Sequence, residues 1–287
     1  MKLKELHIAF QDALFGLTDK EEINSFFFML TEHFVKISRL QLALQPDLEI
    51  NEEQRDLMLH ALEGLKKERP IQYIIGKAFF YDLVFEVDEN TLIPRPETEE
   101  LVDWIVSDVK GVGIENPQVL DIGTGSGCIA ITVAHELPKA AVLALDVSEK
   151  ALEKAYNNAK LNKVNVTFKI QDILKVDSQM SDLPLCSVIV SNPPYVRELE
   201  KKEMKKNVLE YEPDTALFVS DGNPLLFYDK ISDIALTNLE EGGLLYFEIN
   251  QYLAKETKEL VTSKGFKEVT LRKDIYGNYR MLKAIKA

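Results

Sequence analysis

The chain has 287 residues, of which 46% are hydrophobic and 28% are charged, which is the composition of an ordinary globular protein. Its formal net charge of −13 argues against a nucleic-acid partner held mainly through phosphates, because such binding needs a basic surface. There is no apolar run of about 18 residues and no signal-peptide core at the start, so we expect a cytoplasmic protein without a membrane partner.

Residues 1–75 are predicted to form a small helical domain, because they carry helical periodicity and almost no strand pattern. One face of the stretch EEINSFFFMLTEHFVKISRLQLALQ collects four apolar residues, Ile23, Phe27, Leu30 and Phe34. A later helix is expected to begin after Asn51, which can form a capping box with Gln54, and to end at Pro70.

The pattern changes in residues 76–96. The stretch YIIGKAFFYDLVFEVDENTLIP alternates with a period near two and is interrupted at Gly76 and at the sequence DEN. Such alternation predicts a hairpin or a pair of short strands. We interpret this segment as the connector to a second domain, residues 97–287.

Strands and helices alternate through residues 97–287. The expected strands are QVLDIG, AVLALDV, VTFKIQD, CSVIVSN, GLLYFEI, EVTLRKD and YRMLKAIK, with helices between most of them. This alternation predicts an α/β fold with a mostly parallel sheet covered by helices on both faces. The last two strands, joined by a short Gly-Asn turn, are expected to form an antiparallel hairpin at the edge. Residues 196–224 form a long insertion, and its stretch ELEKKEMKKNV is either a solvated helix or a lid over the bound loop of the substrate.

The cysteines and histidines show neither a disulfide framework nor a metal-binding pattern. Cys128 and Cys186 lie in different motifs, and the four histidines, His7, His33, His60 and His135, are scattered along the chain. We therefore expect no metal site, and we expect two small buried thiols in a reducing compartment.

The stretch VLDIGTGSGCIAI is typical of a strand, a glycine-rich turn and a helix at a ligand-binding edge. Gly123, Gly125 and Gly127 allow a tight turn and a close approach of the backbone to a ligand. NAD usually requires the spacing G-x-G-x-x-G, whereas this chain has G-x-G-x-G, and S-adenosylmethionine carries no phosphate. A tight strand-to-helix turn without a ligand is the remaining interpretation.

Three acidic residues follow the predicted strands. Asp146 ends the second strand, where a carboxylate can accept both ribose hydroxyls of either cofactor. Asp121 is expected to order the glycine loop or to meet an ammonium group. Asp172 either reaches an adenine amino group, with Ile173 packed on the ring, or caps a turn.

The fourth strand of this region ends in SNPPYV, which presents a stiff group of hydrogen-bond acceptors. Neither proline has an N–H, and a residue that precedes proline is biased toward an extended backbone. The side-chain oxygen of Asn192 and the carbonyl of Pro193 can therefore accept both N–H groups of a planar amide or amine, and the ring of Tyr195 can stack on it. Orientation alone can lower a reaction barrier by roughly 7–11 kcal/mol, so no strong base is needed. A purely structural Pro-Pro turn is the alternative.

Seven motifs together resemble the peptide chain release factor N5-glutamine methyltransferases. They are RPIQYIIG, LIPRPETEELV, VLDIGTGSGCIAI, SNPPYV, YEPDTALF, DGNPLLFYDKI and KDIYGNYRML, and they run from about residue 69 to the C-terminus. The resemblance implies a seven-stranded, Rossmann-like class I methyltransferase domain with a small N-terminal helical domain joined by a β-hairpin. It also implies S-adenosyl-L-methionine as methyl donor, S-adenosyl-L-homocysteine as product, and the glutamine of the Gly-Gly-Gln loop of class-1 release factors as substrate.

The resemblance also implies which residues of this chain form the site. It implies that Asn192, Pro193 and Tyr195 are catalytic and that Pro194 joins them in contacting the substrate. The implied cofactor contacts are Gly123, Thr124, Gly125, Ser126, Gly127, Asp146, Ile173 and Asn192. The chain departs from the family where members usually have Glu-Ile-Gly followed by Gln, since it has Glu248, Ile249, Asn250 and Gln251. We assign no role there. Arg95, Glu97 and Thr98 either tie the connector to the pocket or are structural.

Three other functions compete with this interpretation. NPPY is shared with adenine-N6 and guanine-N2 nucleic-acid methyltransferases, which makes such an enzyme the main alternative. A nicotinamide-dependent oxidoreductase and a non-catalytic module that only binds release factors are the others.

Overall fold

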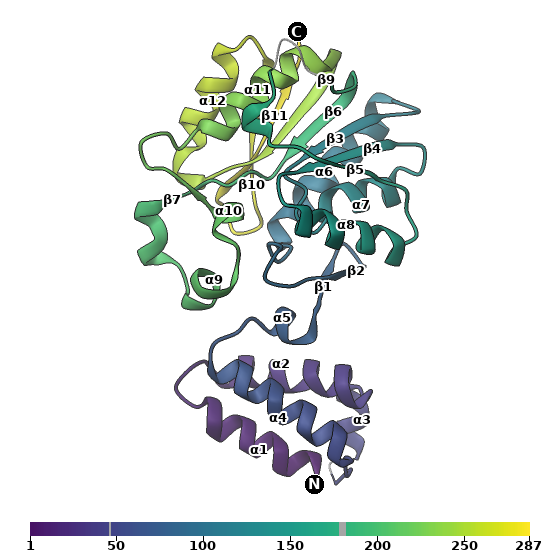
Figure 1. The fold of residues 1–287 in the computed structure, drawn as a ribbon, viewed down its shortest axis with the longest axis vertical. Helices are drawn as coiled ribbons and strands as arrows, with labels where there is room; N and C mark the ends of the chain where they lie inside the picture. The colour runs from purple at the N-terminus through teal and green to yellow at the C-terminus, as the bar shows by residue number, and fades with distance from the viewer. Residues whose placement is uncertain (46, 178–181) are drawn as a thin grey trace. The chain divides into compact units, whose positions relative to one another are not determined.

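The computed structural model describes residues 1–45, 47–177 and 182–287 (Figure 1). These residues form two compact units. Unit 1 consists of Met1–Gly76 together with Lys205–Tyr211, and unit 2 consists of Lys77–Met204 together with Glu212–Ala287. No helix in the described part of the chain is long and apolar enough to cross a membrane.

Unit 1 is helical, as the sequence predicted. Its elements are α1 (Leu3–Leu14), α2 (Lys20–Leu30), the π-helix η1 (Thr31–Val35), α3 (Arg39–Leu44), α4 (Glu52–Lys66), α5 (Ile71–Ile75) and α9 (Lys206–Tyr211). The capping box of α4 is confirmed, because Asn51 and Gln54 exchange hydrogen bonds between side chain and backbone of 2.8 and 3.2 Å. Ile23, Phe27 and Leu30 are buried in the core of this unit, and Phe34 packs against it.

Helix α9 comes from the long insertion and joins unit 1 through polar contacts. The hydroxyl of Tyr211 donates a hydrogen bond to the carbonyl of Lys67 at 2.9 Å, and Lys206 forms an ion pair with Glu68 at 3.4 Å. The sequence had placed this segment with residues 97–287 and did not anticipate that it would pack with the helical unit.

The predicted hairpin in residues 76–96 is formed by β1 (Lys77–Phe80) and β2 (Leu83–Glu86), which pair antiparallel. Its turn lies at Tyr81 and Asp82, whose φ angles of 52° and 61° are in the left-handed region. Two-residue hairpin turns of this kind usually contain Asn and Gly, so these residues gave no turn signal.

Unit 2 contains the predicted seven-stranded sheet, in the order β10-β11-β9-β6-β3-β4-β5. The strands are β3 (Gln118–Ile122), β4 (Ala141–Asp146), β5 (Thr167–Ile170), β6 (Cys186–Ser191), β9 (Leu239–Glu248), β10 (Lys267–Lys273) and β11 (Tyr279–Ile285). Strands β3, β4, β5, β6 and β9 pair parallel, and β11 pairs antiparallel with both β9 and β10. The mostly parallel sheet and the antiparallel edge hairpin are thus confirmed.

Helices cover both faces of this sheet (Figure 1). Helices α6 (Pro96–Val112), α7 (Cys128–Glu136) and α8 (Glu149–Leu161) pack side by side, and α11 (Leu226–Asn238) packs with α12 (Ala254–Ser263). The insertion after β6 contains β7 (Val196–Arg197), a 3₁₀ turn (Glu198–Glu203), α9, α10 (Asp214–Leu217) and β8 (Phe218–Val219). Strands β7 and β8 pair parallel.

The register of the parallel strands brings the predicted site residues to one edge. Ile122 at the end of β3 lies opposite Leu145 of β4 and Ser191 of β6. The residues that follow, Gly123, Asp146 and Asn192, therefore leave the sheet next to one another. This is the carboxyl edge, where ligands bind in open α/β sheets.

Asn158 on α8 ties the hairpin and the glycine loop together. It is fully buried, accepts a hydrogen bond from the Glu86 amide at 2.7 Å, and donates to the carbonyls of Glu86 (3.0 Å) and Ser126 (2.9 Å). Backbone groups that are buried without partners cost about 1–3 kcal/mol each. This single side chain therefore holds the hairpin and the glycine loop together.

We expect Asn158→Ala to lower the free energy of unfolding by about 2–4 kcal/mol, because three buried backbone contacts lose their partner. Asn157→Ala is the matched control, since Asn157 is the preceding residue of the same helix and is exposed. It should stay within about 0.5 kcal/mol of the parent chain. Urea unfolding measures both, and equal losses would contradict the role of Asn158.

Candidate active site

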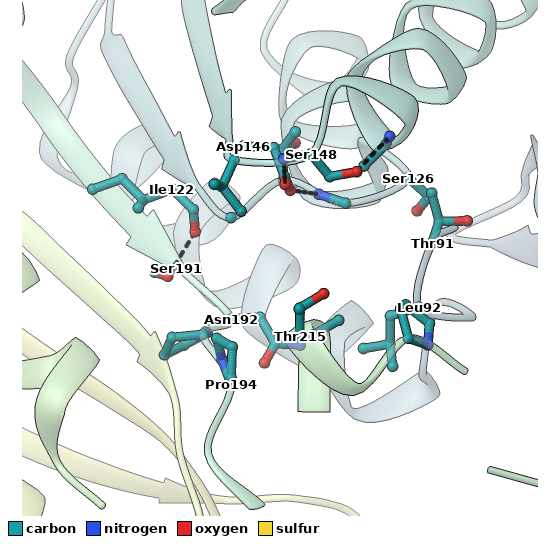
Figure 2. A pocket seen from close by; sticks show the side chains of 18 of the residues that line it. Thr91, Leu92, Ile122, Ser126, Asp146, Ser148, Ser191, Asn192, Pro194 and Thr215 are labelled. Carbon is teal, nitrogen blue, oxygen red and sulfur yellow. Dashed lines mark hydrogen bonds between the residues drawn. The ribbon is translucent and has the colours of Figure 1, made fainter. Parts of the chain in front are cut away.

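A pocket of about 420 Å³ opens at the carboxyl edge of the sheet in unit 2. The glycine loop and the ends of β4 and β6 line it, together with residues from the connector and the insertion, including Leu92, Pro94, Pro213 and Thr215. Figure 2 shows Asp146 and Ser148 on one side of the pocket, and Asn192 and Pro194 on the other. The pocket thus brings together residues from five of the seven sequence motifs.

The glycine loop lines the pocket with backbone rather than with side chains. Gly123 and Gly125 have φ angles of 77° and 55°, and a Cβ atom at either position would meet no heavy atom within 4 Å. Their absent side chains leave the surface open to a ligand. Gly127 (φ 84°) is different, because an added Cβ would lie 2.7 Å from Ile131 Cδ1 and 3.1 Å from Ala155 Cβ. Gly127 does not line the pocket; it allows α7 and α8 to pack closely.

Asp146 lines the pocket next to the glycine loop. Its Oδ2 accepts a hydrogen bond from the Gly125 amide at 2.8 Å, and its Oδ1 accepts one from the Ser148 amide at 2.9 Å (Figure 2). Each carboxylate oxygen has a second lone pair, so both can accept one further hydrogen bond. Burial raises the pKa of this carboxyl, while the backbone amides act against that shift.

The residues after β5 separate into a structural and a pocket-lining role. Asp172 caps a short 3₁₀ turn by accepting from the Leu174 amide at 3.1 Å, and it pairs with Lys175 at 2.9 Å. The capping interpretation is therefore confirmed, although Asp172 also borders the pocket. Ile173 is buried and presents an apolar surface to the same space.

Asp121 lies beneath the loop and orders it, one of its two predicted roles. It is fully buried, does not line the pocket, and accepts a hydrogen bond from the Thr124 hydroxyl at 2.6 Å. Burial raises the pKa of this carboxyl from 3.8 to about 7, and the nearby charge of Asp146 acts in the same direction. Cys128, expected to be fully buried, is instead partly exposed in the pocket wall, and burial still raises the pKa of its thiol to about 12.

The SNPPYV motif leaves β6 beside the glycine loop. Asn192, Pro193 and Pro194 line the pocket, but Tyr195 does not. The Tyr195 hydroxyl donates to Glu248 Oε1 at 2.9 Å and receives a long hydrogen bond of 3.4 Å from Arg280. The stacking role of the Tyr195 ring stays a prediction.

Known proteins similar to this chain are methyltransferases, and the similarity extends over nearly all of its length. A family model of the methyltransferase small domain matches residues 103–217, and a model of the PrmC N-terminal domain matches residues 18–76. A release factor glutamine methyltransferase of Flavobacterium psychrophilum is 52% identical over 284 residues, 99% of each chain. The chain belongs to the release factor glutamine methyltransferase family. Another member, from Bacteroides thetaiotaomicron, is 40% identical over 92% of this chain and 93% of the relative.

Solved structures show the same methyltransferase fold. A methyltransferase from Pyrococcus furiosus superimposes with a TM-score of 0.52 over 83% of this chain and 100% of its own, at 19% identity. A 16S rRNA N2 methyltransferase of T. thermophilus, solved with AdoMet and guanosine, gives a TM-score of 0.52 over 74% of this chain and 50% of its own, at 18% identity. At these identities the likeness concerns the fold alone.

In this family member, the sequence analysis assigned no role to Glu248, which lies behind the NPPY motif, whereas Thr98 was expected either to tie the connector to the pocket or to be structural. Glu248 at the end of β9 accepts hydrogen bonds from the Tyr195 hydroxyl and, at 2.6 Å, from the Thr98 hydroxyl. Thr98 is in turn the acceptor of a 3.4 Å hydrogen bond from Asn192 Nδ2. The signal was a carboxylate at the end of a predicted buried strand, where an acid must have partners.

Asn250, to which the sequence assigned no role, also supports the motif. Its φ of −66° is allowed for any residue, and its side-chain oxygen caps a 3₁₀ turn by accepting from the Tyr252 amide at 2.9 Å. Its Nδ2 donates to the Tyr195 carbonyl at 2.9 Å and to the Glu200 carboxylate at 3.1 Å. Asn250 therefore provides a second hydrogen-bonded link between the NPPY segment and the residues that follow β9.

We expect Gly127→Ala to lower the free energy of unfolding by about 2–4 kcal/mol, because the new methyl group meets Ile131 and Ala155 in a left-handed backbone conformation. Gly125→Ala adds the same atom to the same loop in open space, so it should cost only about 1–2 kcal/mol. Urea unfolding of the two variants compares them, and a larger loss for Gly125→Ala would refute the packing explanation.

Asp121 should make the fold less stable as the pH rises. Between about pH 4 and pH 7 the folded carboxyl keeps a proton that the unfolded one has lost, so stability falls by at most about 1.4 kcal/mol per pH unit. In Asp121→Asn this contribution is absent, and the unfolding free energy should fall less steeply over this range. Denaturation series at several pH values measure both slopes, and parallel profiles would show that Asp121 does not titrate there.

Proposed function

We propose that this chain transfers a methyl group from S-adenosyl-L-methionine to the side-chain nitrogen N5 of the glutamine in the Gly-Gly-Gln loop of class-1 release factors. The observation that carries the proposal is the position of Asn192 and Pro193 in the wall of the same pocket as the glycine loop, in a chain that shares 52% identity over 99% of its length with a release factor glutamine methyltransferase.

The residues of the pocket fit this cofactor. The open backbone at Gly123 and Gly125 suits the amino-acid end, and the remaining lone pairs of Asp146 suit a ribose diol. Ile173 offers an apolar contact for a flat base. When bound, the cofactor supplies an electrophilic methyl group on a positively charged sulfur, and S-adenosyl-L-homocysteine is the product.

The protein's part in the reaction is to hold and orient the carboxamide of the substrate. A carboxamide nitrogen is a poor nucleophile because its lone pair is delocalised into the carbonyl group. Asn192 Oδ1 and the Pro193 carbonyl accept its two N–H groups, favour a pyramidal nitrogen and direct the lone pair into the pocket. When the nitrogen gains the methyl group, one of its two protons leaves to solvent, so that the product is a neutral secondary amide. Pro193 and Pro194 have no N–H and stiffen this acceptor pair.

The pocket offers orientation rather than a strong base. Among the described residues that line it, the ionisable side chains are Arg95, Cys128, Asp146 and Asp172, and no histidine is among them. Asp146 is occupied by backbone amides, and Arg95 pairs with the buried Glu212. Positioning of two reactants can lower a barrier by roughly 7–11 kcal/mol, which makes alignment the main source of rate.

The substrate assignment predicts that the purified protein, incubated with cofactor and a class-1 release factor, adds the mass of one methyl group in place of one hydrogen to the Gly-Gly-Gln glutamine. Fragmentation mass spectrometry locates the site, and a release factor with that glutamine changed to alanine is the control substrate. Transfer to DNA or RNA instead of release factor would favour a nucleic-acid amino-methyltransferase and refute the proposal.

Asn192→Ala should abolish turnover and weaken cofactor binding only modestly, because it removes an acceptor for the reacting nitrogen and leaves the glycine loop and Asp146 in place. Isothermal titration with S-adenosyl-L-homocysteine separates binding from turnover. Asn157→Ala, at an exposed position on α8, should change neither. Turnover of Asn192→Ala at the rate of the parent chain would disprove the assigned role.

A further inference from the structure

Thr98 occupies the first turn of α6 and reaches the pocket from a buried position. Only 2% of its surface is exposed, and it lines the same pocket as Asn192. Its hydroxyl donates to Glu248 Oε2 at 2.6 Å, a short distance that is typical of a hydroxyl bound to a carboxylate. The single proton of this hydroxyl is therefore committed to Glu248.

Because the Thr98 hydroxyl donates its proton to Glu248, it can only accept a hydrogen bond from its other neighbour. A hydroxyl whose proton is already donated can only accept a further hydrogen bond. The neighbour is the side-chain amide of Asn192, which has an NH₂ group at one end and an oxygen at the other. With Nδ2 directed to Thr98 at 3.4 Å, Asn192 Oδ1 is left for a ligand, and it accepts no hydrogen bond within the described part of the chain.

Glu248 is suited to set this polarity because it is held on both sides. Its backbone and side chain are 98% buried, and its second carboxylate oxygen accepts from the Tyr195 hydroxyl at 2.9 Å. Burial raises the pKa of this carboxyl, while the hydrogen bonds from Thr98 and Tyr195 and the charge of Arg280 act against that shift. Each carboxylate oxygen accepts from one hydroxyl, so in this arrangement Glu248 is the acceptor and both hydroxyls are donors.

We propose that Glu248 and Thr98 are positioning residues that orient the Asn192 amide, so that its oxygen rather than its NH₂ group faces the substrate. This inference rests on the proposed function, in which the substrate presents an NH₂ group. In the opposite amide orientation, two NH₂ groups would face each other, and the acceptor would be lost. The first turn of α6 and the end of β9 thus define the orientation of the side-chain amide of Asn192, the residue that follows β6.

Thr98→Val tests the inference, because it keeps the shape of the side chain and removes the hydroxyl. We expect kcat to fall about tenfold, the value of one hydrogen bond, with little change in the affinity for S-adenosyl-L-homocysteine. Thr98→Ser restores the hydroxyl and should recover most of the turnover. Thr132→Val is the matched control, since Thr132 is equally buried but its hydroxyl has no hydrogen-bond partner among the described residues.

A second readout needs no turnover and separates this inference from the proposed function. In ¹⁵N-labelled protein, the side-chain NH₂ resonances of Asn192 are identified by their loss in Asn192→Ala. They should shift in Thr98→Val and stay in place in Thr98→Ser and Thr132→Val. Resonances unchanged in Thr98→Val, or equal kcat for Thr98→Val and Thr132→Val, would overturn the proposal. A parent chain that methylates no release factor, but shows the resonance shift, would refute only the proposed function.

Discussion

The buried carboxylate of Glu248 is the constraint on which the arrangement of the site depends. An acid that is removed from water must receive hydrogen bonds, and here they come from Thr98 on α6 and Tyr195 after β6. Tyr228 on α11 donates to the backbone carbonyl of the same residue at 3.2 Å. Elements that lie far apart in the sequence are therefore held at one point, directly behind the pocket wall.

In the proposed reaction, this constraint is what lets a short motif act on an unreactive group. The two prolines of the NPPY segment have no N–H group. The side-chain amide of Asn192, however, can rotate by half a turn and present either its oxygen or its NH₂ group to a ligand. Contacts from behind remove that freedom, and the same contacts leave the front of the motif free for a ligand. The glycine loop complements this arrangement, because it lines the opposite side with backbone and occupies little space. Hydrogen bonds from behind thus fix the side of the pocket that the NPPY segment forms. The other side, formed by the glycine loop, is open because its glycines have no side chains.

Much of this organisation could be predicted from the sequence, because its signals are local. The capping box at Asn51, the strand–glycine–helix pattern and the strand ending in Asn192 each lie within a few residues. The partners of Glu248 and Asn250 lie in other motifs, and no periodicity links them. The turn at Tyr81 and Asp82 was missed for a different reason, since Tyr81 has a left-handed backbone conformation that a bulky side chain rarely adopts. Cys128 was misjudged because its exposure depends on a cavity that only the folded chain creates.

Unit 1 is built from two separate segments of the chain, which affects how the protein can be cut into fragments. The chain passes from one unit to the other after Gly76, again after Met204 and once more after Tyr211. A fragment that stops at Gly76 would lack helix α9, and with it the tyrosine that caps the Lys67 carbonyl and the lysine that neutralises Glu68. The helical unit is discontinuous in sequence, so its full structure depends on a segment synthesised only after four of the seven strands of the sheet in unit 2.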